Sequence, residues 1–162
     1  MKTLTRVVCA AVGAVSLVLS LSACTAPLPN GNGNCDFSVD YPHGSTTKAG
    51  YIDGKGKVTC TYTKGSLTNL HIETRLQKWN GSSWATVSGT DNTTTQATVK
   101  SGVTYTGVSG FVRCQSGTFR TESRGYGYLD GKKSQSVEWQ TTDTRKGVKN
   151  PCTKPLQVVS VG

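Results

Sequence analysis

The sequence lacks the patterns on which most enzymes and metal sites are built. It has 162 residues, of which two are histidines, one is methionine and nine are acidic. No GxSxG, HExxH, SxxK or DxDxDG pattern occurs, and there is no CxxC pair of the kind that zinc sites use. We therefore expect no catalytic residues, no metal ion and no cofactor. A hydrolase whose site converges from distant positions is the one enzyme class left open.

Helical patterns are also missing past residue 35. Leucine is scarce, Thr, Ser and Gly are abundant, and no stretch keeps a 3.6-residue apolar period. Apolar and polar residues instead alternate over short runs. These runs predict strands over 36–41, 57–63, 67–79, 84–87, 94–100, 103–115, 118–128, 135–142 and 156–159.

Turn signals such as Asn80-Gly81 separate the predicted strands. In the longest run, Leu70, Ile72, Thr74 and Leu76 share one face. Short alternating strands at this spacing predict an all-β fold, either an antiparallel β-sandwich or a barrel. Residues 35–162 would form it as a single domain.

The N-terminus has the layout of an export signal. Positive charge at Lys2 and Arg6 precedes an apolar run over 7–21, which is shorter than the roughly 20 residues of a membrane span. The run ends in Leu21-Ser22-Ala23-Cys24, which resembles the lipobox of bacterial lipoproteins. The resemblance implies that residues 1–23 are a signal peptide and that the sulfur of Cys24 is diacylated. Ordinary secretion without a lipid is the alternative.

Residues 24–34 are rich in Pro, Gly and Asn, and we expect a flexible tether there. Beyond the tether lie Cys35, Cys60, Cys114 and Cys152, which in an exported domain indicate two disulfides. Three pairings are possible. We favour Cys60–Cys114, joining two central strands, and Cys35–Cys152, tying the two ends of the domain together.

Cys60, then Trp79 and Trp84, then Cys114 is loosely similar to the Cys, Trp, Cys pattern of immunoglobulin domains. That fold often has Tyr two residues before the second Cys, where this chain has Val112. The resemblance therefore implies an immunoglobulin-like architecture and nothing about function.

Exposed aromatic residues are the first candidates for binding. Trp79 and Trp84 flank the predicted hairpin, and Trp139 lies on a later strand. Tyr126 and Tyr128 share strand parity with Arg120, Glu122 and Arg124. Rings beside hydrogen-bonding groups suit sugars, whereas packing against the sheet is the simpler interpretation. His71 alternates with Glu73 and Arg75, which is typical of a solvent face, and His43 lies in a loop.

The chain is also basic, with a formal charge of +9 that falls to +7 once Lys2 and Arg6 leave with the signal. Nine cations crowd its C-terminal half: Arg113, Arg120, Arg124, Lys132, Lys133, Arg145, Lys146, Lys149 and Lys154. Export argues against nucleic acid as a partner, so anionic envelope polymers are the more plausible one. A solvated surface with no partner is the alternative.

These observations favour an extracytoplasmic, non-catalytic binding module at the bacterial cell surface. Its partner would be an envelope protein, or an anionic polymer or glycan, and a lipid at Cys24 would hold it to the membrane. The residues expected to bind are Arg120, Arg124, Tyr126 and Tyr128. The alternative is a secreted inhibitor or toxin-like protein that uses the loop around His43 or residues 144–149.

Overall fold

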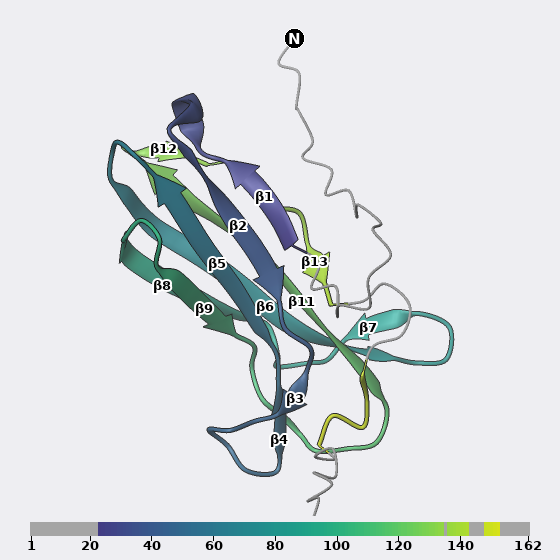
Figure 1. The fold of residues 1–162 in the computed structure, drawn as a ribbon. Helices are drawn as coiled ribbons and strands as arrows, with labels where there is room; N and C mark the ends of the chain where they lie inside the picture. Colours follow the sequence, from purple (N-terminus) through teal and green to yellow (C-terminus); the bar gives the residue numbers. More distant parts are fainter. Residues whose placement is uncertain (1–22, 135, 143–147, 153–162) are drawn as a thin grey trace, which may run out of the picture.

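The computed structural model describes residues 23–134, 136–142 and 148–152 (Figure 1). Two antiparallel sheets face each other, and a third small sheet closes one end. The predicted all-β antiparallel sandwich with two disulfides is confirmed. Within the described residues, no helix is long and apolar enough to cross a membrane. The predicted strand over 156–159 lies outside the described residues.

Each sheet has a simple strand order. The first sheet consists of β1 (Ala23–Pro27), β2 (Gly33–Val39), β5 (Lys55–Tyr62) and β9 (Thr104–Val108), in that order. The path of the second runs through β12 (Lys132–Lys133), β11 (Thr118–Leu129), β6 (Leu67–Trp79) and β7 (Trp84–Thr86). Strand β8 (Asn92–Val99) also pairs with β6, and both β13 (Gln140–Thr141) and β14 (Val148–Lys149) pair with β11. The small sheet consists of β10 (Val112–Arg113), β4 (Tyr51–Asp53) and β3 (His43–Gly44).

The chain passes from the second sheet to the first between β8 and β9, which lie side by side in Figure 1. At this crossing the Tyr62 hydroxyl donates to the carbonyl of Val99 (2.6 Å). A short 3-10 turn, η1 (Pro29–Gly31), joins β1 to β2. The hairpin predicted at Asn80-Gly81 is confirmed, because Trp79 pairs with Trp84 across it.

The pairing of β6 with β11 is the longest in the fold, and one irregularity sets which side chains face inward. Tyr126 pairs with His71 but Tyr128 pairs with Thr68, so the register shifts between them. On β6 this shift falls at Asn69, whose φ is 48°. The extra residue lets Leu67 and Leu70 both point inward although they are three positions apart.

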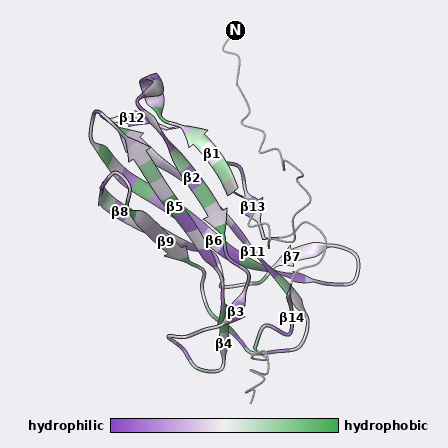
Figure 2. Cartoon of the chain, in the orientation of Figure 1, coloured by the Kyte–Doolittle hydropathy of each residue, from purple (hydrophilic) through white to green (hydrophobic). Residues whose placement is uncertain are grey.

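The core lies between the two large sheets, and a second cluster lies toward the small one. Phe37 and Val58 from the first sheet pack with Leu70 and Ile72 from the second. Hydrophobic and hydrophilic residues alternate along these strands (Figure 2). The predicted inward face of β6 is confirmed, since all four of its members are buried. The second cluster consists of Ile52, Leu76 and Phe119.

The two large sheets approach each other so closely at one position of β5 that a glycine is required there. A Cβ at Gly56 of β5 would overlap the Ser123 side chain of β11, and Ser123 is itself fully buried. We expect Gly56→Ala to lower the free energy of unfolding by about 2 kcal/mol, because overpacking forces the sheets apart. Urea denaturation measures the effect. Gly44→Ala is the matched control, since no atom lies nearer than 3.7 Å to its added Cβ; an equal loss in both variants would contradict the packing argument.

The structure differs from the flexible tether expected over 24–34. Residues 23–27 form β1, which pairs with β2 so that Cys24 lies opposite Phe37. Cys24, Ala26 and Leu28 are each less than 5% exposed. The edge of β2 offers unpaired backbone groups, and the apolar side chains of this segment cover the core beneath. Composition alone hides this because Pro and Gly surround only a few apolar residues.

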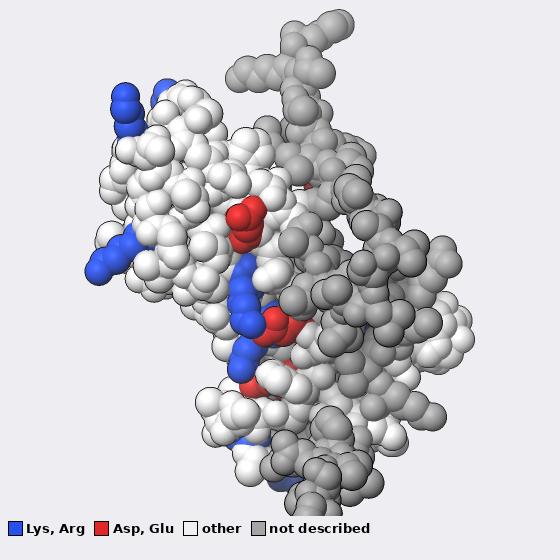
Figure 3. All heavy atoms as spheres, viewed as in Figure 1, with Lys and Arg blue, Asp and Glu red and all other residues white. Residues whose placement is uncertain are grey.

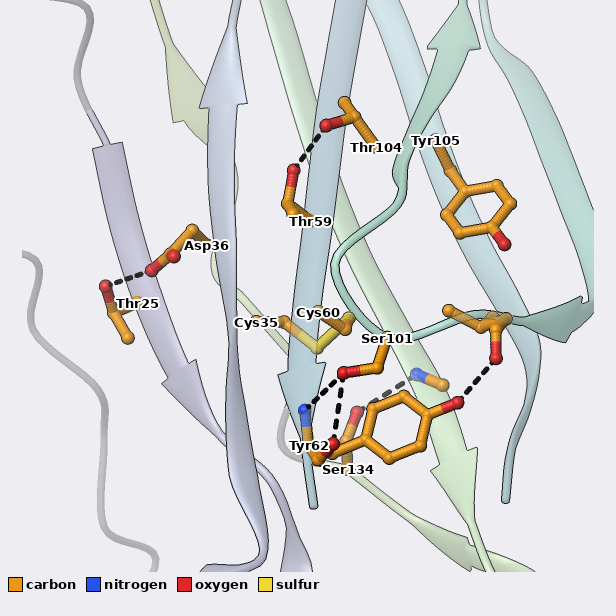
Figure 4. Close-up of a disulfide and its surroundings, with 12 residues drawn as sticks. Thr25, Cys35, Asp36, Thr59, Cys60, Tyr62, Ser101, Thr104, Tyr105 and Ser134 are labelled. Carbon is orange, nitrogen blue, oxygen red and sulfur yellow. Dashed lines mark hydrogen bonds between the residues drawn. A yellow bond between two sulfur atoms is a disulfide. The ribbon is translucent and has the colours of Figure 1, made fainter. Parts of the chain in front are cut away.

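The favoured disulfide pairing, Cys60–Cys114 with Cys35–Cys152, is wrong. Strand β2 pairs with β5 in the register that places Cys35 directly opposite Cys60, with 3.9 Å between their Cα atoms (Figure 4). At the other end of the fold Cys114 bonds to Cys152, with a Cα–Cα distance of 5.8 Å. The immunoglobulin-like bond between Cys60 and Cys114 is therefore not formed. Two disulfides are nonetheless typical of an oxidising compartment outside the cytoplasm.

Candidate functional site

The outer face of the β6–β11 pair gathers most of the binding residues predicted from the sequence. The shared parity of Arg120, Arg124, Tyr126 and Tyr128 is confirmed, because the positions of opposite parity on β11, 121, 123, 125 and 127, are all buried. Across the pair lie polar residues of β6. We call the whole set the β6–β11 outer face: His71, Glu73, Arg75, Gln77, Arg120, Glu122, Arg124, Tyr126 and Tyr128, together with the overlying Trp84, Lys133 and Trp139.

Glu122 is the centre of an ion-pair network on this face. Its Oε2 accepts a hydrogen bond from Arg75 Nε at 2.7 Å, and its Oε1 lies 3.7 Å from Arg120 Nη2. Arg120 Nε donates in addition to Gln77 Oε1 at 2.7 Å. The Glu122 side chain is only 9% exposed, so this carboxylate and its two arginines form a largely desolvated unit.

The third arginine of this face is paired in the same way. Arg124 donates from Nε and Nη2 to Glu73 Oε2, at 2.8 and 2.7 Å. Arg75 also lies 3.7 Å from Asp91. Three arginines thus face three carboxylates, and their formal charges cancel. Charge-assisted hydrogen bonds of this kind fix guanidinium groups in place.

Arg120 is the most enclosed of the three arginines, with 13% of its side chain exposed. Burial lowers the pKa of its guanidinium below the usual range. The Glu122 carboxylate partly offsets this by raising that pKa, and the nearby Arg75 cation lowers it further. Because an arginine starts from a very high pKa, the group keeps its charge and stays a fixed donor.

Aromatic rings lie over the cations along the whole face. Trp139 reaches from the segment beside β11 over both Arg75 and Arg124, with centroid distances of 4.0 and 4.6 Å. Trp84 lies over Arg120 at 4.6 Å. Such cation–π contacts stabilise the arrangement and hold the rings in one orientation.

Toward the far end of β11, Tyr126 lies between two other groups. The His71 ring stacks on it with centroids 4.7 Å apart and an interplanar angle of 20°. Lys133 Nζ lies 3.9 Å from its centroid. Tyr128 contacts the edge of Tyr126 at 6.1 Å. Protein groups therefore already contact the Tyr126 ring, which disfavours stacking of a sugar ring on this tyrosine.

Of the predicted binding residues, Trp79 lies at the margin. It contacts Trp84 at 5.4 Å and is 40% exposed at the end of the β6–β7 hairpin. Glu122 was not predicted as a binding residue, and Trp139 was predicted only as an exposed ring on a later strand, with no link to the arginines. The shared parity of Glu73 and Arg75 on β6 could have indicated the ion pairs. No local sequence pattern indicates that the Trp139 ring contacts arginines on two different strands.

Two grooves border Glu73. One, of about 390 Å³, is lined by Glu73, Thr74, Asp91, Asn92, Thr93 and Trp139. The other, of about 540 Å³, is lined by residues that include Glu73, Arg124, Tyr126, Lys133, Ser136 and Glu138. Their linings carry carboxylates alongside any cation. Neither groove is a basic channel suited to an anionic chain.

The two histidines have structural surroundings. His43 Nδ1 lies 2.8 Å from Oδ1 of Asp53, a residue that is 1% exposed, so the pair ties β3 to β4. His71 stacks on Tyr126 and lies 3.2 Å from the Thr95 hydroxyl. Among the described residues, no three His, Cys, Asp or Glu side chains are grouped to hold a metal ion.

Charge on the opposite side of the molecule is mixed. On the face seen in Figure 3, Lys or Arg and Asp or Glu alternate down the middle instead of gathering in one basic patch.

Comparisons with family models, with curated proteins and with solved structures give no match to this chain. The site is therefore interpreted from its geometry alone.

Proposed function

We propose that this protein is an extracytoplasmic binding module that recognises another protein of the bacterial envelope through its β6–β11 outer face. One observation carries the proposal: three partly exposed arginines and several aromatic rings on one outer sheet face are held in place by carboxylates of the same face. We propose that this surface acts by binding alone, without catalysis and without a cofactor.

The composition of the face favours a protein partner. Trp, Tyr and Arg are the residue types that dominate the energetic centres of protein–protein interfaces, where Lys and Glu are depleted. Here the rings of Trp84 and Trp139 are already oriented over arginines. Binding would therefore cost little side-chain entropy, which is the main advantage of a preorganised surface.

An anionic polymer suits this face less well. Arg120 and Arg124 were the expected contacts for such a polymer, but each already pairs with a carboxylate. A phosphate or uronate chain would have to displace Glu122 or Glu73, and it would meet both negative charges. The partner class therefore shifts from a polyanion to a protein surface with mixed polar groups.

The location follows from the disulfides and from the export segment. Cross-links of this kind persist outside the cytoplasm. We further propose that Cys24 is diacylated after removal of residues 1–23, because Leu21-Ser22-Ala23-Cys24 resembles a lipobox. Two acyl chains would give stable membrane anchoring. Full release of the protein into the culture medium, with a mass that lacks the acyl chains, would contradict the anchor and favour a secreted inhibitor.

The binding proposal is tested by capture from envelope fractions. The full-length oxidised protein is immobilised, and its retention of protein, polysaccharide and lipid fractions is compared at low and high salt. We expect a protein to be retained at both salt concentrations, and we expect Trp139→Ala to weaken retention about thirtyfold, as for an interface hot spot.

Val103→Ala is the control, because it truncates an exposed apolar residue, 41% exposed, away from this face. Its retention of the protein should equal that of the parent. Retention of polysaccharide alone, or retention that Trp139→Ala leaves unchanged, would contradict the assignment of a protein partner to this face.

A further inference from the structure

A second surface with different chemistry lies at the small sheet. We call it the cation–aromatic tip and define it as Lys48, Tyr51, Phe111 and Arg113. Strand β4 pairs with β10 so that Tyr51 lies opposite Arg113. The backbone N–H of Cys114 also donates to the Gly50 carbonyl at 2.8 Å, which joins the loop bearing Lys48 to the segment after β10.

The tip places cations on aromatic rings. Lys48 Nζ lies 4.0 Å from the centroid of Tyr51 and 5.5 Å from that of Phe111, and Arg113 Cζ lies 6.0 Å from Tyr51. Phe111 is 40% exposed, and both cations are exposed too. An exposed phenylalanine thus lies beside exposed basic residues at the small sheet.

The charges of the tip are not cancelled as those of the β6–β11 outer face are. Among the described residues, no carboxylate lies within ion-pair distance of Lys48 or Arg113. The acid of this small sheet, Asp53, is 1% exposed and pairs with His43. The tip therefore directs uncompensated positive charge toward solvent.

We infer that the cation–aromatic tip docks on the surface of an anionic lipid bilayer, with Lys48 and Arg113 at the headgroup phosphates and Phe111 in the interfacial layer. Each basic residue near an anionic membrane surface raises the affinity of the protein for the membrane about fivefold. Aromatic and apolar side chains beside them add burial at the boundary of headgroups and acyl chains. This site is separate from the proposed protein-binding face.

A soluble polyanion would satisfy the two cations but leaves the exposed Phe111 without a role. Dependence of binding on Phe111 therefore separates a bilayer from a soluble chain. The inference also stands apart from acylation of Cys24, because the tip makes its own contact with lipid.

The test uses the full-length chain carrying Cys24→Ser, which removes the sulfur of the proposed acylation site. Every variant is made in this background, so that the apolar segment over 7–21 contributes equally to all. Sedimentation with vesicles of phosphatidylcholine, with and without phosphatidylglycerol, measures binding. We expect Lys48→Ala with Arg113→Ala to weaken binding to the anionic vesicles about 25-fold, as two lost basic contacts imply.

Phe111→Ala should weaken binding to the same vesicles about tenfold, because it removes an exposed apolar side chain that the bilayer would bury. Two controls match these changes: Lys64→Ala with Lys100→Ala removes the same charge from exposed positions elsewhere, and Val103→Ala truncates an apolar residue of 41% exposure. Both controls should bind like the parent.

Equal losses in the tip and control pairs would overturn the inference, and so would unchanged binding of Phe111→Ala. If soluble polyphosphate abolishes vesicle binding equally in the parent and in Phe111→Ala, the inference is also overturned, in favour of a polyanion as the ligand. Capture of a protein partner by the β6–β11 outer face should not change in the tip variants. Failure of the membrane proposal is therefore distinguishable from failure of the protein-binding proposal.

Discussion

Glu122→Gln is expected to lower the free energy of unfolding by about 3 kcal/mol, the loss typical when one partner of a buried ion pair is removed. The side chain of Glu122 is 9% exposed, and it faces both Arg75 and Arg120. Glutamine keeps the size and one acceptor but removes the charge that balances two enclosed guanidinium groups. Urea denaturation of the oxidised protein measures the change, provided that the slope of the transition is preserved.

Glu138→Gln is the control for this prediction. Glu138 lies next to Trp139 but is exposed, so the same chemical change there should cost less than about 0.5 kcal/mol. If Glu122→Gln and Glu138→Gln lose the same stability, the network does not support the fold. We also expect Glu122→Gln to weaken capture of the protein partner, because the arginines and the rings over them lose their fixed orientation.

The strands were predictable where side-chain alternation is long and regular. The run over 67–79 matches β6, and that over 118–128 falls one residue short of β11. Parity alone therefore placed Arg120 and Arg124 on one face. The run over 103–115 instead splits into β9 and β10, because Gly110 packs against the backbone of Gly89 there.

Features that depend on long-range register were not predictable. Two strands of the small sheet, β3 and β4, are too short to show alternation. The position of Cys35 opposite Cys60 follows from the pairing of β2 with β5, which no local pattern specifies. Trp139 joins the site for a similar reason, since its ring crosses from the edge of β11 to Arg75.

Removal of the Cys114–Cys152 disulfide is expected to have the largest effect on stability. Changing both residues to Ser should lower the free energy of unfolding by about 4 kcal/mol, because the bond closes a loop between residues 38 positions apart. Cys152 also packs against the cluster of Ile52, Leu76 and Phe119, so its loss loosens that end of the core. Thermal or urea unfolding of the double variant measures the effect, and a loss below about 1 kcal/mol would contradict it.

Peptide mapping without reduction determines which cysteines are bonded. Trypsin separates all four, because cleavage sites place Cys60 in residues 58–64, Cys114 in 114–120, Cys152 in 150–162 and Cys35 in the peptide that ends at Lys48. The structure predicts that 114–120 is linked to 150–162, and that 58–64 is linked to the peptide of Cys35. A link between 58–64 and 114–120 would instead join Cys60 to Cys114, as in immunoglobulin domains. That result would contradict the Cys35–Cys60 bond, because Cys35 on β2 would lie opposite a cysteine already bonded elsewhere.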